Sequence, residues 1–157
     1  MDDYQFEFIT IDGLNYLDIA TVGVDQYSNF WLGGNYPEGS IQIFHPEAGL
    51  RNHIDHLELD KIIKFAVGEN ISFAIYQKNT DFGIMKLGYT TANLPEYLDF
   101  YTNFPSQFEL IKDIDILGDT VFVTTTAGVF AGDFVHDNLK SSSAWNIKYP
   151  GDAAEQY

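Results

Sequence analysis

The sequence predicts an all-β protein of the β-propeller type, with about three four-stranded antiparallel blades and an additional N-terminal strand. Short runs rich in Ile, Val, Phe, Tyr and Thr alternate with clusters of Gly, Asn, Asp and Pro, which is typical of strands and turns. The best helix candidate, residues 60–67, lacks a sustained helical period and stops at Gly68, so we interpret it as a strand. Ile41, Ile84 and Val129 begin the third strand of successive units at intervals of about 44 residues, within the range of propeller repeats.

Residues 4–11 are expected to form the additional strand. The aromatic residues Tyr4, Phe6 and Phe8 alternate with polar ones, which indicates a strand with one buried face. In propellers a leading strand of this kind often completes the outer edge of the last blade.

The first repeat is expected to span residues 12–59. In its fourth strand, Ile54, Leu57 and Leu59 align only roughly with the apolar positions of the other repeats. The expected strands are 17–24, 30–33, 40–44 and 53–59.

The second and third repeats are expected to span residues 60–105 and 106–150. Their fourth strands are aligned on Phe100 and Trp145, because each lies five residues before a proline. The prolines are expected to lie outside strands, since proline cannot donate a hydrogen bond to a sheet. The other expected strands are 62–67, 72–76 and 83–87 in the second repeat, and 111–117, 120–124 and 128–132 in the third. A β-sandwich or barrel built from the same strands is the alternative fold.

The length and composition limit the number of domains and the kinds of partner. A chain of 157 residues fits one domain, so we treat residues 1–157 as a single partial propeller. Lys and Arg number 8 against 23 Asp and Glu, a formal net charge of -15, which argues against nucleic-acid binding because phosphates would be repelled. No apolar run reaches the roughly 18 residues of a membrane span, so membrane insertion is not expected. The sequence contains no Cys, which excludes a thiolate nucleophile and Cys-based metal sites.

One segment carries a family resemblance. Residues 25–34 read Asp-Gln-Tyr-Ser-Asn-Phe-Trp-Leu-Gly-Gly, which resembles the repeat of bacterial two-component-regulator-type propellers, with Asn29 where a Gly is common. Residues 97–150 are similar to N-terminal propellers of secreted or periplasmic proteins, including those associated with type IX secretion. The resemblance implies a β-propeller and an extracellular or periplasmic location after removal of a signal peptide, with a cytoplasmic location still open. It supplies no catalytic motif.

Carboxylates are the candidates for metal binding. Asp113 and Asp115 are two residues apart on one expected strand, so both point to the same face. They could bind Ca²⁺ through oxygen ligands, or one could act as a general acid. A solvated face, with Ile114 and Ile116 turned toward the core, is the favoured alternative. His136 lies in an expected turn, with no nucleophile or carboxylate partner evident beside it, and no catalytic residue is assigned.

Aromatic residues are the candidates for ligand binding. Tyr-rich outer strands and loops suit recognition, because each ring combines apolar area with a polar tip. Core packing between blades is the competing and favoured explanation. The binding candidates are Tyr97, Tyr101, Trp145 and Tyr149, with Phe104 also expected near the surface.

These observations predict a non-enzymatic scaffold or recognition module that binds a protein or a carbohydrate. The alternative is a carboxylate- or metal-dependent propeller enzyme that acts on a glycan or small substrate. Three blades leave open sheet edges, so we expect either a homodimer that completes a ring or further blades in a longer parent chain. In the dimer, residues 4–11 of one chain would lie at the edge strand near Trp145 of the other.

Overall fold

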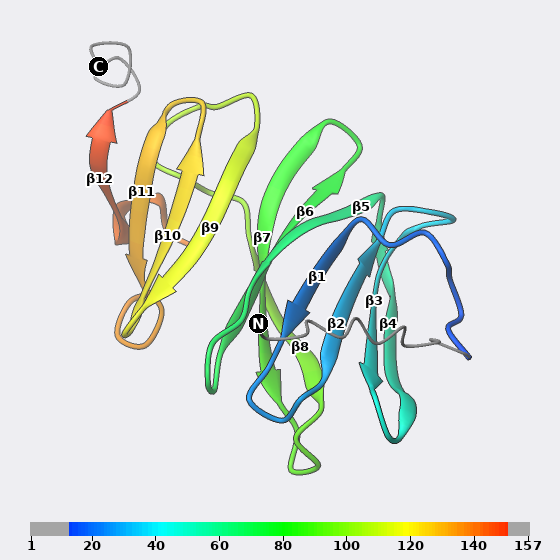
Figure 1. Cartoon of the computed structure of the whole chain (residues 1–157). Coiled ribbons are helices and arrows are strands. Elements are labelled where there is room, and N and C mark those ends of the chain that lie inside the picture. Colours follow the sequence, from blue (N-terminus) through cyan, green and yellow to red (C-terminus); the bar gives the residue numbers. More distant parts are fainter. Residues whose placement is uncertain (1–12, 151–157) are drawn as a thin grey trace, which may run out of the picture.

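The computed structural model describes residues 13–150, and these form an all-β fold of three four-stranded antiparallel sheets (Figure 1). The all-β fold class is thereby confirmed, and the arrangement of three four-stranded sheets is consistent with three blades of a partial propeller. In the described range the helical structure consists of one short 3-10 turn, Ser142–Ala144. The expected strand at residues 4–11 lies outside the described residues. No helix between residues 13 and 150 has the length and apolar character of a membrane span.

Each sheet is a meander of four consecutive strands, paired in the order in which they occur in the chain. The first sheet contains β1 (Thr21–Val24), β2 (Phe30–Gly34), β3 (Gly39–His45) and β4 (Gly49–Leu59). The second contains β5 (Lys61–Ala66), β6 (Ser72–Lys78), β7 (Asp81–Tyr89) and β8 (Pro95–Tyr101). The third contains β9 (Ile111–Leu117), β10 (Thr120–Thr125), β11 (Gly128–Asp133) and β12 (Trp145–Pro150).

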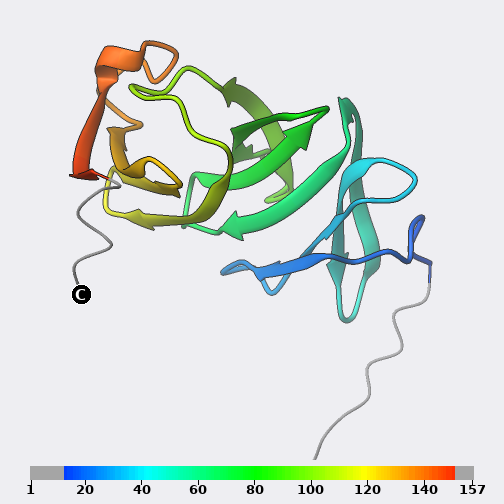
Figure 2. The same cartoon turned by 90° about the horizontal axis from the view of Figure 1, so that it is seen from above.

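The sheets pack face to face in sequence order and fan out around their first strands (Figure 2). Strand β5 contacts β1, β2 and β3 of the first sheet, and β9 contacts β5 and β6 of the second. The middle sheet is therefore covered on both sides, whereas each outer sheet packs against another described sheet on one side.

In the middle sheet, successive side chains of one strand pack into two different hydrophobic cores, one on each face of the sheet. On β6, Phe73 and Ile75 belong to the cluster shared with the third sheet. Their neighbours Ala74 and Tyr76 belong to the cluster shared with the first sheet. Because successive side chains point to opposite faces, a continuous run of buried residues identifies a strand enclosed on both faces.

The turn between β1 and β2 gives a physical reason for the Asp-containing motif. The Asp25 carboxylate is buried and accepts hydrogen bonds from the backbone N–H groups of Tyr27 (2.9 Å) and Asn29 (3.0 Å). It also accepts from Asn29 Nδ2 (3.0 Å) and from the indole Nε1 of Trp31 (3.0 Å). One side chain thereby closes the turn and fixes the orientation of the largest side chain between the first two sheets.

Gly33, two residues after Trp31, allows these sheets to approach closely. A Cβ atom at Gly33 would lie 2.6 Å from Thr21 Cγ2 and 2.7 Å from Ile62 Cγ2, closer than side-chain atoms can pack. Glycine in a strand often marks such an approach. The Trp-Leu-Gly sequence thus combines a large residue that fills the interface with a small one that lets β5 come near.

The fourth strands differ from the expected alignment. Phe100 lies near the end of β8, opposite Met85, whereas Trp145 is the first residue of β12, opposite Gly132. The shared distance to a proline is therefore coincidental, because the connection before β12 is longer than the one before β8 and shifts the strand start. The expectation that prolines lie outside strands is also wrong at two positions: Pro95 begins β8, and Pro150 ends β12. Both strands are at sheet edges, where proline is tolerated because the missing N–H is not needed for pairing.

The other predicted strands are confirmed with small shifts in their limits. The first strand is shorter than expected, because β1 begins at Thr21 and residues 17–20 are not part of it. The segment 60–67, interpreted as a strand rather than a helix, contains β5. The expected strand 111–117 coincides with β9.

Candidate functional site

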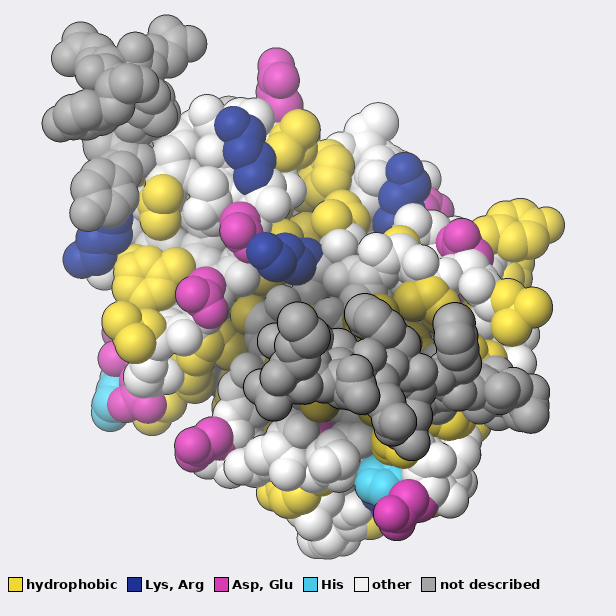
Figure 3. Space-filling model, in the orientation of Figure 1, with side chains coloured by type: hydrophobic (Ala, Val, Ile, Leu, Met, Phe, Trp, Pro, Cys, Tyr) yellow, Lys and Arg dark blue, Asp and Glu magenta, His cyan; other side chains and the backbone are white. Residues whose placement is uncertain are grey.

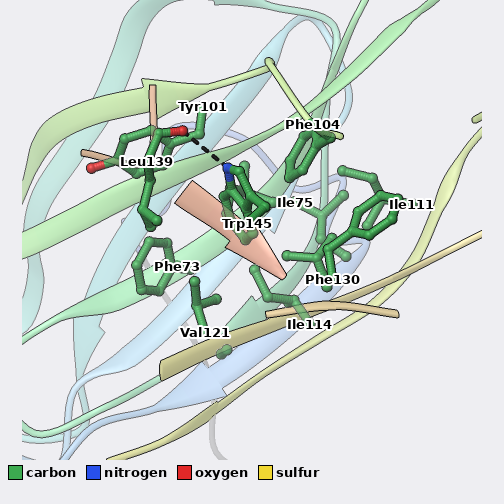
Figure 4. Close-up of a cluster of buried hydrophobic side chains, with 13 residues drawn as sticks. Phe73, Ile75, Tyr101, Phe104, Ile111, Ile114, Val121, Phe130, Leu139 and Trp145 are labelled. Atoms are coloured by element: carbon green, nitrogen blue, oxygen red, sulfur yellow. Dashed lines mark hydrogen bonds between the residues drawn. The ribbon is translucent and has the colours of Figure 1, made fainter. Parts of the chain in front are cut away.

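Two of the four aromatic binding candidates are buried in the core between the second and third sheets (Figure 4). Trp145 is 4% exposed and Tyr101 is 7% exposed. The indole Nε1 of Trp145 donates a hydrogen bond to the carbonyl oxygen of Leu139 at 3.0 Å. Phe104, which we also expected near the surface, is buried beside Trp145 with ring centres 4.9 Å apart. Tyr101 and Phe104 are therefore not surface residues. Their burial agrees with packing between sheets, the explanation favoured from the sequence, because the interface between the second and third sheets takes up these large rings.

The four candidates are not brought together on one face. Tyr97 is partly buried against the cluster between the first and second sheets, where its ring lies 4.7 Å from that of Phe100. Burial raises the pKa of the Tyr97 hydroxyl. Tyr101 and Trp145 belong to the opposite side of the second sheet. The backbone of Tyr149 lies in β12, opposite Val129.

Asp113 and Asp115 are both exposed, and Ile114 between them is buried. Lys64 Nζ donates to Asp113 Oδ1 at 2.5 Å, and this hydrogen bond is the main cause that lowers the pKa of the Asp113 carboxyl. The Asp115 carboxylate accepts from the backbone N–H of Ile116 at 2.8 Å. Between residues 13 and 150 no group of three or more His, Asp and Glu side chains converges as a metal site would.

A carboxylate does lie beside His136, contrary to our expectation from the sequence. The imidazole Nδ1 is 3.0 Å from Asp133 Oδ2, and this contact raises the pKa of His136. The backbone N–H of His136 also donates to Asp133 Oδ1 at 2.8 Å. The pair is formed by the turn after β11, in which the carboxylate accepts hydrogen bonds from residues two and three positions later.

A cleft lies at the end of the second and third sheets, where the β6–β7 turn approaches the long connection between β8 and β9. Its volume is about 370 Å³, within the range of small-molecule sites. Figure 1 shows both segments, the green β6–β7 turn and the yellow-green connection, at the upper edge of the molecule. We call this cleft the loop cleft, and it is lined by Thr80, Asp81, Phe82, Thr102, Asn103, Phe104, Ser106, Gln107, Phe108 and Glu109.

The loop cleft has an aromatic base fixed to the core. Phe104 is buried, and its ring lies 5.3 Å from that of Phe108 and 5.9 Å from that of Phe130 in β11. Phe82 and Phe108 are only partly buried and pack against the same core. The rings are therefore held by the sheet interface while part of their surface faces the cleft.

Most polar side chains of the loop cleft make no hydrogen bond to other groups within residues 13–150. Within residues 13–150, the Asn103 amide donates to the Lys140 carbonyl oxygen at 3.3 Å, and the backbone N–H of Glu109 donates to Thr126 Oγ1 at 2.9 Å. In the same range, the side chains of Thr80, Asp81, Thr102, Ser106, Gln107 and Glu109 make no hydrogen bond to another protein group. These groups are available to a ligand.

Two further cavities share lining residues with the loop cleft. One, of about 280 Å³, shares Asp81, Phe82 and Thr102 and adds Lys78. The other, of about 550 Å³, shares Phe108 and is completed by the β10–β11 turn. The hollowed surface therefore extends along one end of both sheets.

Sequence reasoning did not find the loop cleft, because its lining comes from two segments about 20 residues apart that meet only in the folded protein. Phe104 and Phe108 alternate with Thr, Asn, Ser, Gln and Glu in the connection 102–110. This connection is longer than the median of about 4–6 residues, and loops held by a rigid scaffold are where binding residues are often found.

Comparison with protein-family models and with curated proteins found no match to this chain.

Proposed function

We propose that this protein is a non-enzymatic recognition module of the propeller type that binds a protein or carbohydrate partner in the loop cleft. The observation that carries the proposal is the combination of an aromatic base with polar side chains that have no partner in the described protein. Sites for ligands commonly join apolar surface with a few polar groups. Loops held by a rigid scaffold are a frequent position for such sites.

The test is a binding screen against a glycan array and a peptide array, with the native chain and with the double variant Asp81→Ala/Gln107→Ala. Both side chains are exposed and make no hydrogen bond within the described residues, so the fold should tolerate their truncation. Glu96→Ala, an exposed acidic residue on β8 outside the cleft lining, is the matched control. The proposal requires a ligand that the double variant loses and the control retains.

The second candidate function is a carboxylate- or metal-dependent enzyme that uses Asp113 and Asp115. The exposed position of both carboxylates keeps them accessible, but Lys64 already neutralises one of them. A rise of several degrees in melting temperature with millimolar Ca²⁺, reversed by chelator, would support this candidate. We expect no such rise, because a cation would have to displace the lysine.

We also propose that the chain self-associates. Strand β12, which begins at Trp145, is an edge strand that pairs with β11 in the described structure, and Ile147 on it is 47% exposed. Exposed apolar edge strands favour pairing between chains. A closed dimer that completes one ring is the arrangement we favour. Deleting residues 1–11 should shift the sedimentation coefficient from dimer toward monomer or aggregate, and a folded monomer before and after deletion would contradict this proposal.

A further inference from the structure

We infer that the ligand of the loop cleft is an uncharged saccharide. The inference rests on the proposed function and specifies the chemical class that this site would recognise. Four properties of the cleft support it: its hydrogen-bonding groups, its aromatic surface, its charge and its small amount of strand backbone.

The hydrogen-bonding groups complement a set of vicinal hydroxyls. The carboxylates of Asp81 and Glu109 accept hydrogen bonds, whereas the amides of Asn103 and Gln107 both donate and accept. Three hydroxyl side chains complete the lining and can take either role. Each sugar hydroxyl is itself a donor and an acceptor, so a mixed lining of this kind can satisfy several hydroxyls of one ring at once.

The aromatic surface suits the other face of a sugar. Phe82 and Phe108 are partly exposed, and Phe108 packs on the buried ring of Phe104. The face of an aromatic ring carries negative charge density, which attracts the weakly positive C–H groups on the apolar face of a pyranose. Apolar rings next to unengaged amides and carboxylates thus match a ligand with one apolar face and a polar rim.

The charge of the cleft disfavours acidic sugars. Its lining contains two carboxylates and no Lys, Arg or His, and the adjoining cavity of about 280 Å³ adds one cationic side chain, Lys78. The chain as a whole carries a formal charge of -15. In the view of Figure 3 the acidic side chains are spread over the surface rather than gathered in one patch. A uronate or another anionic sugar would be repelled without a compensating cation.

The cleft offers little backbone to an extended peptide. The lining residues that belong to a strand are Asp81 and Phe82, at the start of β7. Strand addition depends on a series of main-chain hydrogen bonds along an exposed sheet edge, and two residues cannot supply such a series. A basic peptide attracted by the two carboxylates is the competing ligand, and the experiment below includes it.

The experiment measures dissociation constants by calorimetry for the best binders from three sets: neutral oligosaccharides, oligosaccharides with carboxylates, and basic peptides. The proteins are the native chain, Asp81→Ala/Gln107→Ala, Phe108→Leu and the control Glu96→Ala. Phe108→Leu keeps an apolar side chain against Phe104 but removes the ring. We expect a neutral oligosaccharide to bind best. Its affinity should fall about tenfold or more in both cleft variants, as loss of one good contact implies, and stay unchanged in the control.

The outcomes separate the inference from the proposed function. Cleft-dependent binding of a basic peptide or an acidic sugar, without a neutral one, would overturn the inference and leave the recognition module in place. No cleft-dependent ligand in any set would overturn both. Melting temperatures of the variants identify a folding defect, and if Phe108→Leu is unstable the double variant, which alters only exposed side chains, decides the result.

Discussion

The buried carboxylate of Asp25 provides the sharpest test of how this fold is held together. Asp25→Ala removes an acceptor used by two backbone N–H groups and by the side chains of Asn29 and Trp31. The side chains of Asn29 and Trp31 lie in residues with 0% exposure, so water cannot replace the lost acceptor without opening the sheet interface. The backbone N–H of Tyr27, in a partly exposed turn, can be hydrated.

The size of the effect follows from three buried donors: the backbone N–H of Asn29, its side-chain amide and the indole of Trp31. Each buried donor left without a partner costs about 1–3 kcal/mol, which gives about 3–9 kcal/mol for the three. Removing the carboxylate also relieves the cost of burying a charge, so we expect a loss of about 3 kcal/mol in the free energy of unfolding. With a urea m-value of about 2 kcal/mol per M, the unfolding midpoint should fall by about 1.5 M.

The measurement is urea unfolding followed by circular dichroism, with Asp137→Ala as the control because Asp137 is exposed and its side chain makes no hydrogen bond within residues 13–150. A double-mutant cycle with Trp31→Phe isolates the bond to the indole and should give a coupling of about 1 kcal/mol or more. A loss in Asp25→Ala below about 1 kcal/mol, or no larger than that of the control, would refute the reasoning that this carboxylate organises the interface.

Three further predictions concern the sheet interfaces and the charged groups. Gly33→Ala places a methyl group against Ile62 and should reduce the free energy of unfolding by about 1–3 kcal/mol in urea titrations; an unchanged midpoint would show that the sheets can separate without cost. Asp113→Asn should change stability by less than about 1 kcal/mol, because the ion pair is about half exposed and screened by solvent, and a larger loss would contradict that description. In an NMR titration His136 should have a pKa above 6.5, and this pKa should fall in Asp133→Asn, which removes the main cause of the rise. The stabilisation from the raised pKa is present below pH 6.5 and is lost as the pH rises through the folded pKa, so an unshifted His136 would argue against the contact in solution.

Much of the strand framework could be predicted because it depends on local signals. The pattern of apolar and polar residues in 111–117 predicts both ends of β9 correctly, and the turn at Gly118 separates it from β10. The interval of about 44 residues reflects the repetition of one four-stranded unit. Even the Asp25 motif could be recognised as a turn before a Trp-Leu-Gly strand, although the sequence alone did not show that the carboxylate binds the indole.

The candidate sites depend on contacts between segments that are distant in the chain. Such contacts form only when the sheets pack against one another, so they could not be predicted from the sequence. Lys64 meets Asp113 because β5 and β9 are adjacent first strands of neighbouring sheets, and Tyr101 is buried because the third sheet covers its side of the second. The loop cleft arises in the same way, from a turn at Thr80 and a connection 102–110 that the sheets bring to one end. A period of two specifies that a strand has two faces, but packing energy summed over whole sheets determines which neighbour covers each face. The strands and their repetition could therefore be predicted from local sequence patterns. Which sheet covers each strand face, and where the loop cleft forms, depend on how the three sheets pack together.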